Sequence, residues 1–258
     1  MTIIISLQSS RSISGTTSIA LTLAYLLGTK GRTLYIEGDF LNPTLSQIMH
    51  TSNFRKYSND WIIGEASLND SCVEVNDRSR LPPMNLYVVA ANDLDDARRR
   101  MEVLDIQRDK RLLSTLENEK WMVGGKPLDY VIIDTSALLN YLLATVSYVS
   151  NYLVYVIKPN TYELAILEDR IKKIYSKFVC VVRPIVNFYQ PGDENAKNFE
   201  RIFIKRIGIE PVKIPYIPEL KEGIDLTRLF NKNNRLQNYL VEIMDEIIKK
   251  PEISSESI

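Results

Sequence analysis

The chain has 258 residues, with 32 lysines and arginines balanced by 32 aspartates and glutamates, so its formal net charge is zero. A zero balance gives no general attraction to nucleic acid or to an acidic membrane surface, and only a local basic patch would supply one. No apolar run approaches the ~20 residues of a membrane span, and the apolar start is too short for a signal peptide, so we expect a cytoplasmic protein.

Runs of branched and aromatic residues alternate with segments of helical period along the chain. This pattern is typical of a mostly parallel sheet that is covered by helices on both faces. The expected strands are residues 2–7, 33–36, 86–90, 130–134, 152–157 and 179–187, with a shorter apolar piece at 212–214. Within the strand at 179–187, Arg183-Pro184 predicts an irregularity, because proline cannot donate to a neighbouring strand.

Helical periodicity follows several of these strands. The expected helices are residues 17–27, 162–175 and 235–249, with one or two charge-rich surface helices in 93–119. The apolar segments 138–149 and 171–182 are expected to form core and packing surface. We expect one α/β domain over residues 1–250, with a polar, irregular insertion at about 51–84 on the edge of the sheet and a frayed tail at 251–258.

Polar residues gather where three of the expected strands end. A loop of small residues leads from the first strand into a helix that begins near Thr16-Thr17, Asp39 follows the second strand, and Asp134-Thr135 ends the strand at 130–134. In a doubly wound sheet, ligands bind beyond the carboxyl ends of the strands, where the strand order reverses. This layout is that of a P-loop nucleotidase.

The loop and these strand ends resemble the ParA/MinD group of P-loop ATPases, and the resemblance covers residues 2 to 248. The group's loop reads Lys-Gly-Gly-x-Gly-Lys-Thr-Thr, where this chain has Ser10-Arg11-Ser12-Ile13-Ser14-Gly15-Thr16-Thr17. Residues 34–45 are similar to the group's second-strand signature and 129–135 to its Walker B strand. Val186-Asn187 and 215–218 resemble its adenine-side elements. The resemblance implies a doubly wound, mostly parallel sheet flanked by helices.

Compared with that group, the loop lacks both lysines. Gly15 stands at the position of the main lysine and Ser10 at that of the additional lysine, while Arg11, Ser12 and Ser14 replace the glycines. The lysine of such a loop reaches the β- and γ-phosphates of the nucleotide. Losing one positioned charge costs on the order of 10²-fold in rate. The sequence therefore predicts hydrolysis close to background.

The resemblance nevertheless implies a nucleotide site for ATP or ADP with Mg²⁺. Its metal-proximal residues are Thr16, Asp39 and Asp134. Its nucleotide-binding residues are Ser10, Arg11, Ser12, Ile13, Ser14, Gly15, Thr16, Thr17, Asn187, Pro215 and Tyr216. Several of them have a structural alternative: Arg11 is a solvated loop residue, Thr16 or Thr17 caps the helix, the aspartates face water or cap a helix, and Asn187 is a turn residue.

Three functional hypotheses follow. The first is a binding, regulatory or scaffolding module with little or no ATP hydrolysis, paired with itself or with a related active ATPase. The second is an ATPase of the partition or positioning type, in which the guanidinium of Arg11 replaces the lysine. The third is DNA association without sequence preference, which the neutral net charge does not favour.

Overall fold

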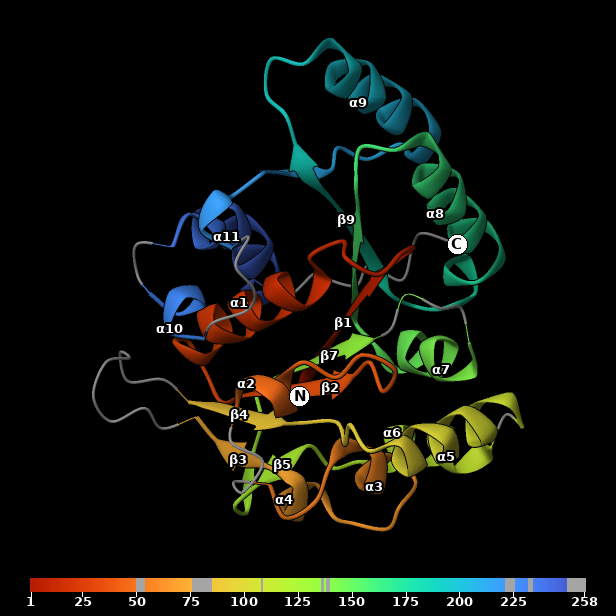
Figure 1. The fold of residues 1–258 in the computed structure, drawn as a ribbon, viewed down its shortest axis with the longest axis vertical. Coiled ribbons are helices and arrows are strands. Elements are labelled where there is room, and N and C mark those ends of the chain that lie inside the picture. The colour runs from red at the N-terminus through yellow and green to blue at the C-terminus, as the bar shows by residue number, and fades with distance from the viewer. Residues whose placement is uncertain are drawn as a thin grey trace.

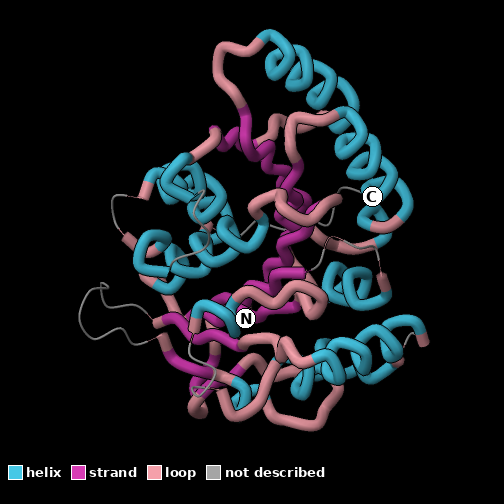
Figure 2. Tube along the Cα trace, viewed as in Figure 1, coloured by secondary structure: helices cyan, strands magenta, loops and turns pink. Residues whose placement is uncertain are grey.

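An eight-stranded sheet runs through the molecule, and helices cover both of its faces (Figures 1 and 2). The computed structural model describes residues 1–49, 54–75, 85–107, 109–135, 137, 140–220, 226–231 and 234–249. The expected tail at 251–258 lies outside these residues, as do the ends of the expected insertion at 51–84. No helix in the described ranges is long and apolar enough to cross a bilayer.

The strands of the sheet follow the order β10-β9-β8-β1-β7-β2-β4-β3. All neighbours are parallel except β3 and β4. The strands are β1 (Ile3–Ser9), β2 (Thr33–Gly38), β3 (Val73–Glu74), β4 (Leu86–Val89), β7 (Tyr130–Thr135), β8 (Tyr152–Ile157), β9 (Val181–Tyr189) and β10 (Val212–Pro215). A separate hairpin joins β5 (Met122–Val123) and β6 (Lys126–Pro127). The expected doubly wound, mostly parallel sheet is confirmed.

Alternate residues of each strand supply the cores on the two faces. Ile3, Ile5 and Leu7 of β1 pack on one side and Ile4 on the other, because successive side chains of a strand point to opposite faces. The first face is covered by α1 (Thr16–Gly28), α2 (Leu45–Ile48), α10 (Leu226–Leu229) and α11 (Arg235–Ile248). The second is covered by α5 (Asp95–Ile106), α6 (Lys110–Asn118), α7 (Tyr141–Val149), α8 (Thr161–Lys173) and α9 (Glu194–Ile207) (Figure 1).

The described part of the expected insertion, residues 54–75, is more regular than its polar composition indicates. It contains α3 (Ser58–Ile62), α4 (Leu68–Ser71) and the edge strand β3. Trp61 and Leu68 are buried in the core of the second face. Both helices are too short to show a helical period in the sequence.

The predicted irregularity at Arg183-Pro184 is wrong. Pro184 lies opposite Tyr155 in unbroken register with β8. Strand β10 begins opposite Ile185, so β9 has only one neighbouring strand at Pro184, and a missing N–H is tolerated where one side of a strand is open. The register shift falls instead in β10, between Ile214 and Pro215.

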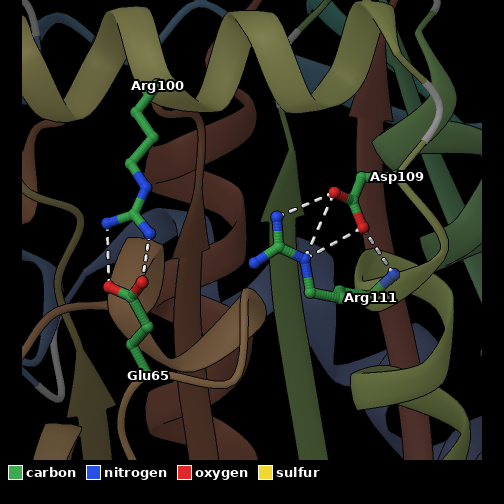
Figure 3. A network of polar contacts seen from close by, with 4 residues as sticks. All are labelled: Glu65, Arg100, Asp109 and Arg111. Atoms are coloured by element: carbon green, nitrogen blue, oxygen red, sulfur yellow. Dashed lines mark hydrogen bonds and ion pairs between the residues drawn. The ribbon is translucent and has the colours of Figure 1, made fainter.

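The charge-rich helices α5 and α6 carry short-range ion pairs on their exposed surface. Figure 3 shows Arg100 of α5 reaching Glu65 through both carboxylate oxygens, and Arg111 folding back on Asp109 at the start of α6. The hydrogen bonds from Arg100 lower the pKa of Glu65. Such exposed pairs contribute little to stability.

Candidate functional site

The candidate site lies at the carboxyl ends of the central strands. Strand β1 lies between β8 and β7, and the chain proceeds from β1 to β2 on one side and from β7 to β8 on the other. The strand order therefore reverses beside β1, which is where open α/β sheets bind their ligands. Residues 10–15 connect β1 to α1 at this point.

The loop folds around one of its own carbonyl groups. The hydroxyls of Ser9 and Ser14 donate to the carbonyl oxygen of Arg11 at 2.9 and 2.8 Å. Ile13 and Gly15 have positive φ angles of 64° and 81°. For the branched Ile13 this conformation is unfavourable, and its side chain is 86% exposed. The tight turn is thus made by hydroxyl hydrogen bonds and one strained residue, without the glycines of the related motif.

Asn187 closes the space above Gly15. Its Nδ2 donates to the carbonyl of Ser14 at 2.8 Å, and its Oδ1 accepts from the N–H of Phe188 at 2.9 Å. A Cβ built on Gly15 would lie 2.4 Å from Asn187 Nδ2, so no side chain fits there unless Asn187 moves. Both halves of the amide therefore have partners within the chain.

The start of α1 retains unpaired polar groups. Within the described ranges, no oxygen accepts from the backbone N–H groups of residues 12–17, and the buried hydroxyl of Thr16 has no hydrogen-bond partner. The N-cap is Gly15, and no side chain caps the helix there, so the alternative that Thr16 or Thr17 is the cap is wrong. The Thr17 side chain instead lowers the pKa of the nearby Asp134 carboxyl group, against the larger effect of its burial. A row of free N–H groups at a helix start binds anions.

Ser10 carries no charge, and the guanidinium of Arg11 lies over the ring of Tyr162. The Ser10 hydroxyl donates to Glu163 Oε2 at 3.1 Å, and Glu163 is only 2% exposed in the first turn of α8. The guanidinium carbon of Arg11 lies 5.1 Å from the ring centroid of Tyr162, and Ser12 is exposed. The position of the additional lysine therefore faces a carboxylate, and Arg11 stacks on an aromatic ring.

The predicted metal-proximal aspartates lie at the ends of neighbouring strands β2 and β7. Asp134 is 2% exposed and accepts from the Tyr35 hydroxyl at 3.0 Å. Burial, followed by repulsion from Asp39 and Glu37, raises its pKa to about 7 against the hydrogen bonds from Thr17 and Tyr35. Asp39 accepts from the N–H groups of Leu41 and Asn42 at 3.2 and 3.1 Å, and burial raises its pKa.

Glu37 is a third buried carboxylate beside these aspartates, and the sequence reasoning missed it. It accepts from the N–H groups of Thr44, Leu45 and Ala91, so it ties the segment after β2 to the segment after β4. Burial raises its pKa to about 7. Among the residues that the structure describes, no group of three or more acidic, histidine or cysteine side chains is arranged to hold a metal ion by itself.

A cavity of about 340 Å³ opens beside the loop. Its lining brings together five of the predicted nucleotide-binding residues, Ile13, Gly15, Asn187, Pro215 and Tyr216. Phe188, which was not predicted, completes one wall, and its ring centroid lies 6.2 Å from that of Tyr216. Asp39 and Asp134 do not line the cavity. The walls are mainly apolar, as in most small-molecule sites.

This strand order, with a loop and helix start at the reversal point, is the ParA/MinD type of P-loop NTPase fold. No family model matches the chain, and no curated protein matches it by sequence. Solved structures match over nearly the whole chain, at 12 to 19% identity for those given next, which shows the fold alone.

Three of these structures illustrate the likeness. A plasmid partition protein of Borrelia burgdorferi bound to AMPPNP is 15% identical, with a TM-score of 0.72 over 96% of this chain and 99% of that one. The septum site-determining protein MinD of Pyrococcus horikoshii with Mg-ADP is 19% identical, with a TM-score of 0.68 over 97% and 100%. The ParA protein of pNOB8 bound to nonspecific DNA is 12% identical, with a TM-score of 0.69 over 96% and 98%.

Proposed function

We propose that this protein is a nucleotide-binding module of the ParA/MinD fold that hydrolyses little or no ATP and acts as a regulatory or scaffolding partner. The closure of the Gly15 position by Asn187 is the observation that carries this proposal. The resemblance implies a catalytic lysine at this position, and a Cβ built on Gly15 would lie 2.4 Å from Asn187 Nδ2, so a lysine fits there only if Asn187 moves.

The absence of a loop lysine is expected to have a large effect on the rate of hydrolysis. A loop lysine neutralises the negative charge that develops on a transferring phosphoryl group, and one such charge is worth on the order of 10²-fold in rate. The Arg11 guanidinium is the substitute that the second hypothesis requires, but it stacks on Tyr162. The geometry therefore supports the binding module over the ATPase that uses Arg11.

Nucleotide binding itself has support from groups that do not depend on a lysine. The free N–H groups of residues 12–17 suit phosphate oxygens, and the apolar cavity of about 340 Å³ suits a base. Thr16 has an orphaned buried hydroxyl, which fits Mg²⁺ because this ion is bound by one or two protein oxygens together with nucleotide phosphates. Bound there, Mg²⁺ would offset phosphate charge, and Thr16 would hold it with Asp39 and Asp134 close by.

An exposed apolar rim around the site supports a protein partner. Ile13 is 86% exposed, Tyr162 59% and Tyr216 45%. Exposed apolar groups that surround a site mark interaction surfaces. The partner we propose is a second copy of this chain or a related ATPase. DNA association has no comparable support in the charge distribution, although the ParA protein of pNOB8 was solved on nonspecific DNA.

Calorimetric titration of the protein with ATP and Mg²⁺, together with a phosphate-release assay, tests the proposal. We expect saturable binding with release close to background. Multiple-turnover hydrolysis would contradict the proposal, and its loss in Arg11→Ala would establish the Arg11 mechanism instead. The double variant Gly15→Lys with Asn187→Ala provides a matched comparison, because it returns the lysine and also clears the space it needs.

A further inference from the structure

Lys158 lies beside the loop, although it is distant from it in the sequence. It directly follows β8, which pairs in parallel with β1 on one side and β9 on the other. Val156 lies opposite Ser9, and Ile157 lies opposite Val186. Lys158 therefore leaves the sheet between the start of the loop and Asn187, at the same edge as the candidate site.

Glu163 accepts one hydrogen bond from the backbone of Lys158 and one from Ser10, the residue at the position of the additional lysine. The N–H of Lys158 donates to Glu163 Oε2 at 3.0 Å, and the Ser10 hydroxyl donates to the same oxygen at 3.1 Å. Glu163 thus holds Lys158 and Ser10 side by side. Lys158, directly after the neighbouring strand β8, thus carries an ammonium group of the kind that Ser10 and Gly15 lack.

The side chain of Lys158 lies over a ring that lines the cavity. Its Nζ lies 5.4 Å from the ring centroid of Phe188, which lines the cavity. The Cζ of the same ring lies 3.9 Å from a Cβ built on Gly15, the position of the missing main lysine. The Phe188 ring therefore lies close both to the ammonium of Lys158 and to position 15 of the loop.

The charge of Lys158 has fewer partners than that of Arg170, the buried cation at the same edge of the sheet. Buried Arg170 donates to the carbonyls of Ser9 and Ala137, both at 3.0 Å, and Arg11 lies on the Tyr162 ring. Within the described ranges the Lys158 ammonium makes no ion pair, and it lies over the Phe188 ring. Such a contact is weak enough for a phosphate group to displace it.

We propose that Lys158 binds the phosphate groups of the nucleotide, so that an ammonium carried by β8 serves the binding role of the missing loop lysines. This inference rests on the nucleotide binding proposed above and adds the residue that selects phosphorylated ligands. The ammonium of Lys158 would reach the phosphate groups from the side of the site where β8 ends. The N–H groups of the loop and α1 supply the remaining phosphate contacts.

Calorimetry with ATP, ADP and adenosine tests this role in wild-type protein, Lys158→Gln and Lys158→Arg. We expect Lys158→Gln to weaken ATP and ADP binding about tenfold, which is the scale of one charge-assisted contact, and to leave adenosine binding unchanged. Lys158→Arg should retain most of the affinity. Lys126→Gln serves as the control, because Lys126 is an exposed lysine on the hairpin before β7.

The remaining outcomes separate this inference from the proposed function. If the wild type binds ATP and Lys158→Gln binds it within twofold of that affinity, the role of Lys158 is wrong and the proposed function stands. If adenosine affinity falls as much as ATP affinity, Lys158 only supports the Phe188 wall, and the inference is again wrong. If the wild type binds neither ATP nor ADP, both proposals fail. Circular dichroism of each variant confirms that it is folded.

Discussion

Asp134 and Glu37 are buried carboxyl groups whose pKa values are raised to about 7. In an unfolded chain both titrate near pH 4. Because the folded pKa of each is above the unfolded one, the folded state binds these protons more tightly. Their contribution to stability is fully present below about pH 4 and is lost as the pH rises through 7. The protein without nucleotide should therefore be less stable at pH 8 than at pH 5.

Replacing Asp134 tests this pH dependence. Asp134→Asn keeps an oxygen for the Tyr35 hydroxyl but cannot ionise, so we expect it to lose less unfolding free energy than the wild type between pH 5 and pH 8. Urea unfolding at the two pH values measures the difference. Asp245→Asn, at an exposed position on α11, should behave like the wild type. Equal losses of unfolding free energy between pH 5 and pH 8 in Asp134→Asn and wild type would show that this carboxyl group does not cause the pH dependence.

Gly15 and Asn187 should be energetically coupled. Gly15→Ala is expected to cost about 1–2 kcal/mol for a left-handed backbone, and more because its Cβ displaces Asn187. In an Asn187→Ala background only the backbone part remains, so the two substitutions together should cost less than their sum. Urea unfolding of the four proteins measures the coupling.

A second glycine isolates the backbone part of that cost. Gly208 has a φ of +84° at the end of α9, and a Cβ there meets nothing within 4 Å. Gly208→Ala should therefore cost about 1–2 kcal/mol whether or not Asn187 is present. Additive behaviour of Gly15→Ala and Asn187→Ala would contradict the closure of this space by Asn187.

At the scale of elements, Arg170 attaches α8 to the start of the loop. It is 6% exposed and donates to the carbonyls of Ser9 and Ala137. Arg170→Met fills similar space but removes both bonds, so we expect the unfolding free energy to fall by about 3 kcal/mol. Arg206→Met, which breaks the exposed pair between α9 and Glu168 of α8, should cost less than about 1 kcal/mol. Comparable losses of unfolding free energy in the two variants would contradict the expected difference between the buried and the exposed contacts.

The sheet was predictable because most of its strands are short, continuous apolar runs. The strand at 152–157 was predicted with the bounds that β8 has in the structure. Helix α9 was missed, although Ala196, Phe199 and Phe203 recur on one helical face and are buried. Helix α7 is apolar on nearly all sides, so it shows no clear period and was expected only as core.

The site was harder to predict than the sheet because its contacts depend on strand order. The loop is close to Lys158, Glu163 and Phe188 because β8 lies next to β1 and β9 lies next to β8. This strand order cannot be read from the spacing of residues in the sequence. The loop, Asn187, Pro215 and Tyr216 were identified by resemblance, and the structure places several of them around one cavity. The double hydrogen bonding of Asn187 is a property of side-chain geometry that a residue pattern does not contain.

At the scale of the whole molecule, the proposed pairing should depend on nucleotide and on Ile13. Sedimentation velocity of the wild type should show a shift from monomer toward dimer when ATP and Mg²⁺ are added, because ligand and partner cover the same edge. Ile13→Ser should weaken that shift, since Ile13 is 86% exposed beside the cavity.

Val179 is the matched control for this surface. It is a branched residue with 83% exposure, located just before β9 and therefore at the opposite edge of the sheet. Val179→Ser should associate as the wild type does. A wild-type protein that sediments identically with and without nucleotide, or an Ile13→Ser variant that associates normally, would rule out this face as the contact.

The packing of Asn187 over Gly15 also links the two positions, because a larger residue at position 15 fits only if Asn187 moves. A lysine introduced at position 15 alone meets the Asn187 amide, and removal of Asn187 alone leaves the Ser14 carbonyl without its donor. We therefore expect each single replacement to lower the stability of the protein more than the pair does. Positions 15 and 187 are therefore expected to change together rather than one at a time.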